Sequence, residues 1–149
     1  MKKQAIMSLV FLIGILLTGQ FTFAQASNKN ERHLYINGEG EVLNDSGFKL
    51  GYISKDDIVY NNKDEKLGFI QNGKVYDAEG KPLGKAKKNG SYYNNQGENV
   101  LVVKGDGDKC EILDPKGHHM GTVHKNYKLH SCAVHCFFLE EVMKEESEK

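Results

Sequence analysis

The sequence lacks any block of basic residues interleaved with aromatic ones. Its 149 residues contain 20 Lys and Arg against 20 Asp and Glu. Nucleic-acid affinity depends on the neutralisation of phosphate charge by clustered basic side chains. We therefore exclude nucleic acid as a partner.

The sequence also lacks an apolar run of the roughly 20 residues that a membrane-spanning helix needs. Its N-terminal run, AIMSLVFLIGILL, follows Lys2 and Lys3 and precedes small and polar residues, which is the pattern of a secretory signal peptide. We predict a signal peptide over residues 1–24, with cleavage after Ala24 or Ala26. The mature protein is then periplasmic or secreted and has no membrane span.

No catalytic signature stands out in the sequence. It contains no CxxC pair, no HExxH motif, no P-loop and no nucleophile elbow, and no Ser-His-Asp order or paired carboxylates can be singled out from spacing. We predict that the protein is not an enzyme.

What is present is a repeat that fills most of residues 25–149, a length that suits one domain. Copies begin near residues 42, 59, 75, 92 and 112 and read VLNDSGFKLGYI, VYNNKDEKLGFI, VYDAEGKPLGKA, YYNNQGENVLVV and ILDPKGHHMGTV. Self-similarity at a nearly constant period indicates one supersecondary unit copied along the chain. The apolar or aromatic residues that open each copy favour a strand.

The third and sixth positions of the repeat predict a tight turn. Asn or Asp at the start of a type I turn caps the backbone, and Gly or Asp in the left-handed position closes it. The third position holds Asn44, Asn61, Asp77, Asn94 and Asp114, and the sixth holds Gly47, Asp64, Gly80, Gly97 and Gly117. Each copy is therefore predicted to form a β-hairpin.

A further glycine follows in the second strand of four copies, at Gly51, Gly68, Gly84 and Gly121, whereas the fourth copy has Leu101 there. Glycine inside a strand marks a bulge or a backbone that packs too closely for a side chain. We expect an added side chain at these positions to destabilise the fold.

Turn signals also separate the copies. Asn72-Gly73, Asn89-Gly90 and Asp106-Gly107 predict primed turns with positive φ, and Asn37-Gly38 gives the same signal before the first copy. The chain then forms an antiparallel meander of about ten short strands. A meander must cover its edges, and five copies favour closure into a pseudo-symmetric ring.

This repeat, of the form apolar-Tyr-Asn/Asp-x-x-Gly-x-x-Leu-Gly-x-Ile over roughly residues 33–138, resembles the 5-fold beta-flower family of exported bacterial proteins. The resemblance implies five β-hairpins around a pseudo-fivefold axis. It implies no particular activity, and no catalytic residue follows from it.

The C-terminal segment predicts a short amphipathic helix near residues 131–145. Val134, Phe138 and Val142 recur at four-residue spacing, which is the spacing of one helix face. Ser131 is a plausible N-cap. We expect this helix to cover one end or edge of the β assembly, and a helix that binds a partner is the alternative.

His130, Cys132, His135 and Cys136 form the candidate metal site of the sequence. On a helix Cys132 and Cys136 share a face, and such ligands suit zinc or copper. Alternatively these cysteines are core residues or disulfide partners of Cys110, since a Cys132–Cys136 bridge would strain a single helical turn. A metal-binding or redox protein is therefore the alternative function, and the main interpretation needs no cofactor.

Five tyrosines could stack on sugars, since aromatic faces bury well while the hydroxyl group stays hydrated. They are Tyr35, Tyr60, Tyr76, Tyr92 and Tyr93. Three of them occupy one column of the repeat, and recurrence at the repeat period favours a structural role.

Our main prediction is an exported binding or structural module of one β-repeat domain. The turns NDSG, NNKD, DAEG, NNQG and DPKG are expected on one face of the ring, where they would meet an unidentified protein or glycan. Variable loops on a rigid scaffold are where recognition usually lies.

Overall fold

The computed structural model describes residues 33–138. The predicted signal peptide and residues 139–149 lie outside this range. Within it the chain forms eleven strands followed by a helical segment. The strands are β1 (Leu34–Ile36), β2 (Glu41–Leu43), β3 (Lys49–Ile53), β4 (Ile58–Asn61), β5 (Lys66–Gln71), β6 (Lys74–Asp77), β7 (Pro82–Ala86), β8 (Tyr92–Asn94), β9 (Asn99–Lys104), β10 (Lys109–Leu113) and β11 (His119–His124).

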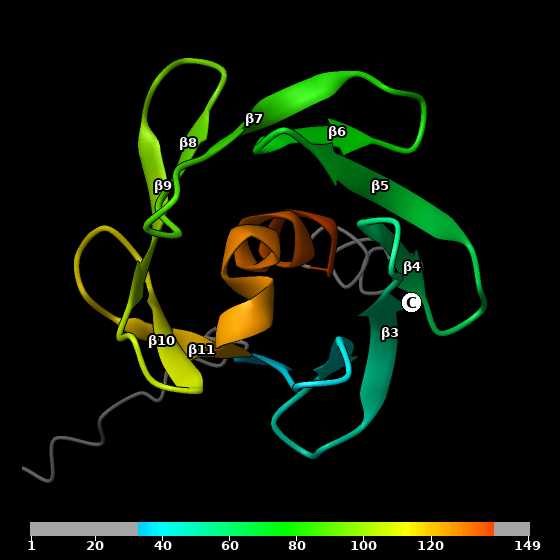
Figure 1. Cartoon of the computed structure of the whole chain (residues 1–149), viewed down its shortest axis with the longest axis horizontal. Helices are drawn as coiled ribbons and strands as arrows, with labels where there is room; N and C mark the ends of the chain where they lie inside the picture. Colours follow the sequence, from blue (N-terminus) through cyan, green and yellow to red (C-terminus); the bar gives the residue numbers. More distant parts are fainter. Residues whose placement is uncertain (1–32, 139–149) are drawn as a thin grey trace, which may run out of the picture.

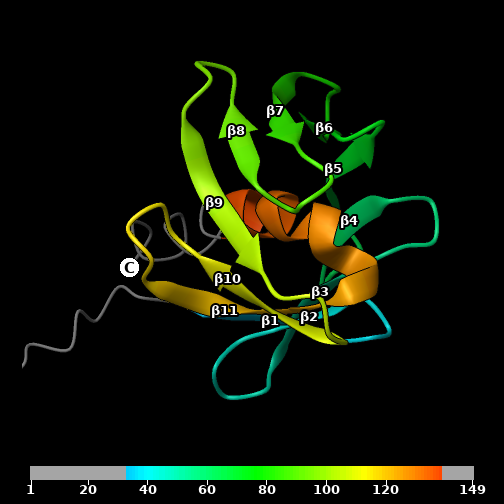
Figure 2. The ribbon, with the colours of Figure 1, turned by 60° about the vertical axis from the view of Figure 1, so that its left-hand side comes forward.

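The strands form one closed, barrel-like sheet (Figures 1 and 2). Sequence neighbours from β1–β2 to β10–β11 pair antiparallel, as the meander predicts. The ring closes differently, because β1 runs parallel to β11 with Leu34 opposite Gly121 and Ile36 opposite Val123. The all-β prediction is confirmed, with one correction: a short strand before the first copy of the repeat closes the sheet through a parallel pair. Closure removes the exposed edges that an open sheet would have.

Alternate side chains of the strands point into the ring. In β1, Leu34 and Ile36 are buried while Tyr35 between them is partly exposed. The first position of each repeat copy faces inward in the same way, and these residues are Val42, Val59, Val75, Tyr92 and Ile112. The strand-opening position of the repeat therefore builds the core.

The centre of the ring is occupied by the C-terminal helical segment (Figure 1). It begins as the 3-10 element η1 (Lys125–His130) and continues as α-helix over residues 131–138. Val134, Phe137 and Phe138 are buried in the same core as the inward-facing strand residues. The predicted helix near 131–145 is confirmed as far as residue 138, and it lies inside the ring rather than only over an edge.

Ser131 is not the N-cap that its position suggested. Its φ of −54° and ψ of −37° are helical, and its hydroxyl group donates a hydrogen bond to the Lys128 carbonyl at 2.7 Å. The segment is capped instead by His124, whose Nδ1 accepts from the Asn126 N–H at 3.3 Å. The helical backbone starts earlier than the apolar pattern indicates because it follows β11 directly.

The second-strand glycines lie where no side chain fits. A Cβ on Gly51 would lie 2.6 Å from Phe138 Cζ, and one on Gly68 would lie 2.8 Å from Phe137 Cε1. On Gly84 it would lie 2.6 Å from Tyr92 Cζ. Real side-chain contacts are not this short, so the close-packing interpretation of this column is supported by the geometry.

A register shift accompanies each of these positions. It recurs in the pairs β2–β3, β4–β5, β6–β7, β8–β9 and β10–β11. In every case the extra residue is the one before the glycine column, as with Leu67 between Lys66 and Gly68. The bulge therefore belongs to the preceding apolar residue, and the glycine itself is crowded.

The turns between the copies differ partly from the prediction. Asn72 and Gly73 both have positive φ, at 52° and 74°, as a primed turn requires. In the other three dipeptides the two residues do not share positive φ, and Gly40, Gly90 and Gly105 take the left-handed position instead.

Within residues 33–138 no helix is long and apolar enough to cross a membrane.

Candidate functional site

The hairpin turns are held by one repeated set of hydrogen bonds. Asn61 Oδ1 accepts the backbone N–H groups of Lys63 and Glu65, both at 2.9 Å. The same pair of bonds, to the second and fourth residues onward, forms at Asn44, Asp77, Asn94 and Asp114. Each turn is closed at positive φ by Gly47, Asp64, Gly80, Gly97 or Gly117. The turn chemistry predicted from the third and sixth positions is therefore present in all five copies.

The middle residues of these turns face outward. Asn62, Lys63 and Glu79 are exposed. Figure 1 shows the turns around the periphery of the ring, pointing away from its centre, rather than gathered on one face. The fixed turn backbones thus present variable side chains around the rim.

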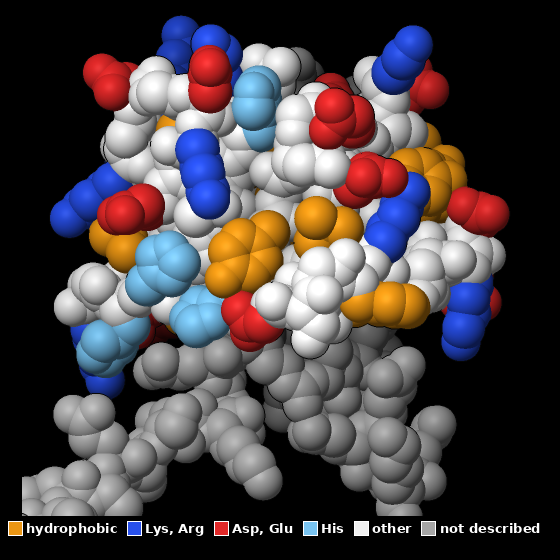
Figure 3. Space-filling model, turned by 90° about the horizontal axis from the view of Figure 1, so that it is seen from below, with side chains coloured by type: hydrophobic (Ala, Val, Ile, Leu, Met, Phe, Trp, Pro, Cys, Tyr) orange, Lys and Arg blue, Asp and Glu red, His pale blue; other side chains and the backbone are white. Residues whose placement is uncertain are grey.

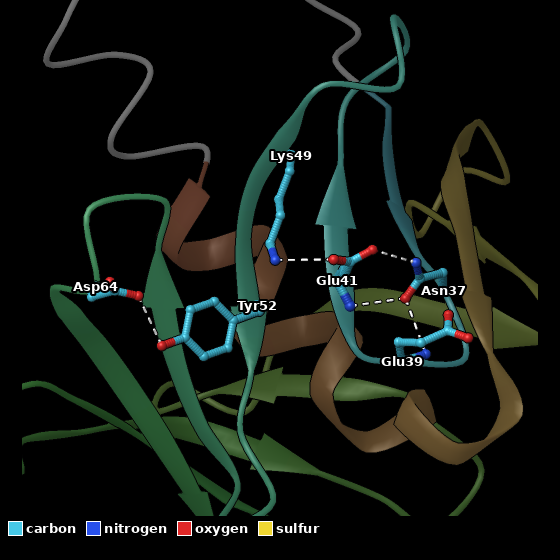
Figure 4. A network of polar contacts seen from close by, with 6 residues as sticks. All are labelled: Asn37, Glu39, Glu41, Lys49, Tyr52 and Asp64. Carbon is cyan, nitrogen blue, oxygen red and sulfur yellow. Dashed lines mark hydrogen bonds and ion pairs between the residues drawn. The ribbon is translucent and has the colours of Figure 1, made fainter.

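A sixth turn of the same kind precedes β2 and is joined to the next strand by an ion pair (Figure 4). Asn37 Oδ1 accepts the N–H groups of Glu39 and Glu41, and its Nδ2 donates to Glu41 Oε2 at 2.9 Å. Lys49 Nζ lies 2.9 Å from Glu41 Oε1. Lys49 and Asn37 together hold the pKa of the Glu41 carboxyl below its usual range.

Two of the outward tyrosines pair with aromatic rings on neighbouring strands. Tyr60 stacks on Tyr52 with ring centroids 5.2 Å apart, and Tyr76 stacks on Phe69 at 4.9 Å. Lysine ammonium groups lie over several of these rings, as Lys87 does over Tyr93 at 4.3 Å. Tyr92 points inward and is buried. Cross-strand packing is therefore the main role of this repeat column.

The candidate metal ligands are spread along the internal helix. His130 Nε2 lies 2.8 Å from Asp57 Oδ1, to which it donates because a carboxylate only accepts. Cys132 is buried and directs its thiol to the Leu129 carbonyl at 3.1 Å. Within residues 33–138 no three His, Cys, Asp or Glu side chains form a group that could hold a metal ion. The structure therefore does not bring His130, Cys132, His135 and Cys136 together as one ligand set.

His135 is buried in the ring without a polar partner. Both its ring nitrogens lack a hydrogen bond, and burial lowers the pKa of His135 to about 4. An imidazole in this setting stays neutral at pH 7. His135 therefore acts as an uncharged core residue.

The cysteines are thiols, and those on the helix lie close to Tyr92. Burial, then the neighbouring Cys136, raises the pKa of the Cys132 thiol to about 12. Burial, followed by Cys136 and Cys132, also raises the pKa of Tyr92. Cys110 is buried and forms no disulfide with either cysteine. The raised pKa values keep Cys132 and Tyr92 protonated at neutral pH. The burial of both Cys132 and Cys110 fits the core interpretation of these two cysteines.

Two polar contacts of the helical segment carried no signal in the sequence. Asp57 lies at a φ of 61° in the turn before β4 and is 73 positions from His130 in the chain. His124 caps the helical segment although histidine is not among the preferred N-cap residues. The regular spacing of turns between the repeat copies is the one sequence feature that could have indicated the positive φ of Asp57.

A closed all-β ring around an internal helix, with side-chain-capped turns on its rim, defines the class of this protein. The family model described as 5-fold beta-flower protein matches residues 24–140, and the chain belongs to this family. The family prediction made from the repeat is thus confirmed. No curated protein and no solved structure matches the chain.

Proposed function

We propose that the protein is an exported module that binds a protein or glycan partner through its outer surface, principally through its rim turns. The observation that carries this proposal is the internal helix. A barrel that binds a small ligand inside keeps its interior open. Here Val134, Phe137 and Phe138 fill that space, so the outer surface is left for recognition.

The proposal includes the finer arrangement of five hairpins around a pseudo-fivefold axis. It is supported by the five recurring register shifts and by the five turns with the same side-chain cap. Equivalent local geometry in successive copies is what an approximate rotation axis requires. The turns would then meet a partner at regular angular intervals.

The turns suit recognition because their backbones are fixed while their tips vary. Each cap satisfies two backbone donors, which limits the conformational entropy that binding would otherwise remove. The exposed tips differ in charge, with Lys63 in one turn and Glu79 in the next. The proposal also includes export to the periplasm or the medium, which the N-terminal leader pattern supports. It includes no bound cofactor and no catalytic activity.

Site-specific photo-crosslinking in the producing cells tests the role of the turns. A diazirine amino acid is placed at Lys63, Glu79 or Gln96, all exposed at turn tips. Lys55 and Lys88, which are exposed in the turns between copies, serve as matched controls. We expect discrete adducts from the tip positions and none from the controls, and protease digestion of the adduct distinguishes protein from glycan. Adducts from the controls alone, or from no position, would contradict the proposal.

A further inference from the structure

A cleft of about 300 Å³ lies where β1 meets β11 on the outer face of the ring. Tyr35 and Thr122 are opposite each other in this parallel pair, and their neighbours along the strands are buried. The residues that line it and bear on its chemistry are Tyr35, Gly38, Asp108, Lys109, Thr122 and His124. Figure 3 views the molecule from this side and shows histidine side chains beside hydrophobic and acidic ones. The volume is at the small end of ligand pockets.

Tyr35 gives the cleft an aromatic wall in a fixed position. Its hydroxyl group donates to Asp45 Oδ1 at 3.0 Å, and the His33 ring also contacts that carboxylate oxygen at 3.2 Å. Unlike Tyr60 and Tyr76, Tyr35 has no aromatic residue stacked on it among the described residues. The hydroxyl end of the Tyr35 ring is therefore held in place, and the face of the ring remains available for a ligand to stack on.

His124 presents a hydrogen-bond donor to the cleft. Because Nδ1 accepts from the Asn126 N–H, the proton of the neutral ring is on Nε2. Nε2 lies 3.7 Å from where a Cβ on Gly38 would be. The missing side chain at Gly38 thus leaves space over the face of the His124 ring.

The remaining polar groups are of mixed kind. Thr122 contributes a hydroxyl group, and Lys109 contributes an ammonium group. Asp108 Oδ1 is held by Lys125 Nζ at 2.6 Å, which leaves its other carboxylate oxygen as an acceptor. Lys125 also holds the pKa of Asp108 below its usual range, so this group is a carboxylate at neutral pH.

We propose that this cleft binds one saccharide ring, with an apolar face of the sugar on Tyr35. The sugar hydroxyl groups would be hydrogen-bonded by Asp108, Thr122 and His124. A purely apolar ligand would leave these polar groups unpaired, whereas a saccharide ring combines an apolar face for Tyr35 with several hydroxyl groups for the polar side chains. The lining contains no residue of the five turns, and the NDSG turn contributes only the Asp45 carboxylate that holds the Tyr35 hydroxyl group. The inference therefore does not depend on the role proposed for the turn tips.

Amide chemical shifts of the uniformly labelled full chain test the proposal directly. The probes are the methyl glycosides of glucose, galactose, N-acetylglucosamine and glucuronic acid. We expect at least one to shift the Gly38, Lys109 and Thr122 amides, with a dissociation constant on the order of 1 mM, as a single ring in a small cleft allows. No shift with any probe, or shifts confined to other parts of the ring, would overturn the proposal.

Variants separate stacking from a general effect on the fold. Tyr35→Leu should weaken binding about tenfold, whereas Tyr35→Phe keeps the ring and should bind within about threefold of the native protein. Tyr93→Leu, which removes an outward tyrosine elsewhere on the ring, should leave binding unchanged. If Tyr35→Leu does not fold, Thr122→Ile replaces it, because it removes the hydroxyl group and adds bulk within the cleft. Unchanged binding in the folded variant would overturn the proposal.

Discussion

Gly68 in β5 lies directly against the ring of Phe137 on the internal helix. A Cβ at Gly68 would be 2.8 Å from Phe137 Cε1, and the Tyr76 carbonyl oxygen on the next strand lies closer still to the same point. Gly51 and Phe138 are related in the same way. The helix and the sheet therefore fit together because the repeat has no side chain at these positions.

Replacement of Gly68 by valine should destabilise the protein by at least about 3 kcal/mol. The new side chain meets a ring on one side and a backbone oxygen on the other, and the backbone oxygen cannot move away without breaking strand pairing. Chemical denaturation measures the change. Glu79→Ala, at an exposed turn tip, should alter stability by less than about 0.5 kcal/mol. Equal melting temperatures for the two variants would show that the glycine column is not a packing feature.

Asn61→Ala tests the side-chain cap of the turns. The substitution leaves the N–H groups of Lys63 and Glu65 without their acceptor, and we expect a loss of about 1–3 kcal/mol in the free energy of unfolding. Asn62→Ala, at the adjacent exposed position, should have little effect. A smaller loss for Asn61→Ala than for Asn62→Ala in urea unfolding would contradict the structural role of the cap.

His135 should make the fold sensitive to acid. The folded state keeps the ring neutral down to a pKa of about 4, whereas the ordinary pKa of 6.5 applies once the chain unfolds. The unfolded chain therefore binds more protons between these values, so stability is complete above about pH 6.5 and falls as the pH drops toward 4. The loss attributable to this one group is up to about 3 kcal/mol.

The comparison of native protein with His135→Leu isolates this effect, because every other titrating group is common to both. Leucine is apolar and of similar bulk, and it leaves no unpaired ring nitrogen in the core. We expect the difference in melting temperature between the two proteins to shift in favour of the variant as the pH falls from 7 to 4.5. A difference that is independent of pH would show that His135 keeps its ordinary pKa in the folded protein, as an exposed ring would.

Cys132 should resist alkylation in the folded protein. Its thiol is buried, and a pKa of about 12 leaves almost no thiolate at pH 8. Mass spectrometry after brief iodoacetamide treatment should find this residue unmodified until denaturant is added. Rapid modification of Cys132 under native conditions would contradict its position inside the ring.

The sequence allowed the turns and the inward-facing positions to be predicted because both depend on local chemistry that recurs in each copy. Asn61 and Asp64 identify one turn by themselves, and Val59 identifies the buried start of the strand. The crowding at Gly68 could be expected from the repeat, but not the residue that causes it. Phe137 lies almost 70 positions further along the chain.

The closure of the ring and the position of the helix depend on contacts that are distant in sequence. Strand β1 is three residues long and falls outside the repeat, so nothing local indicates its parallel pairing with β11. The His and Cys residues cluster in the sequence because they share one segment, yet a helix points successive side chains in different directions. His130 thus meets Asp57, while His135 is buried among apolar groups.

Unfolding of a chain that ends at His130 tests most directly the central claim that the internal helix is part of the barrel core. This chain lacks Val134, Phe137 and Phe138, all of them buried in the ring. We predict that it loses near-ultraviolet circular dichroism and cooperative unfolding in urea, since several large core side chains are removed at once. A truncated chain that unfolds as cooperatively as the full chain, at a similar urea concentration, would show that the ring stands without its helix and that its interior is available for a ligand.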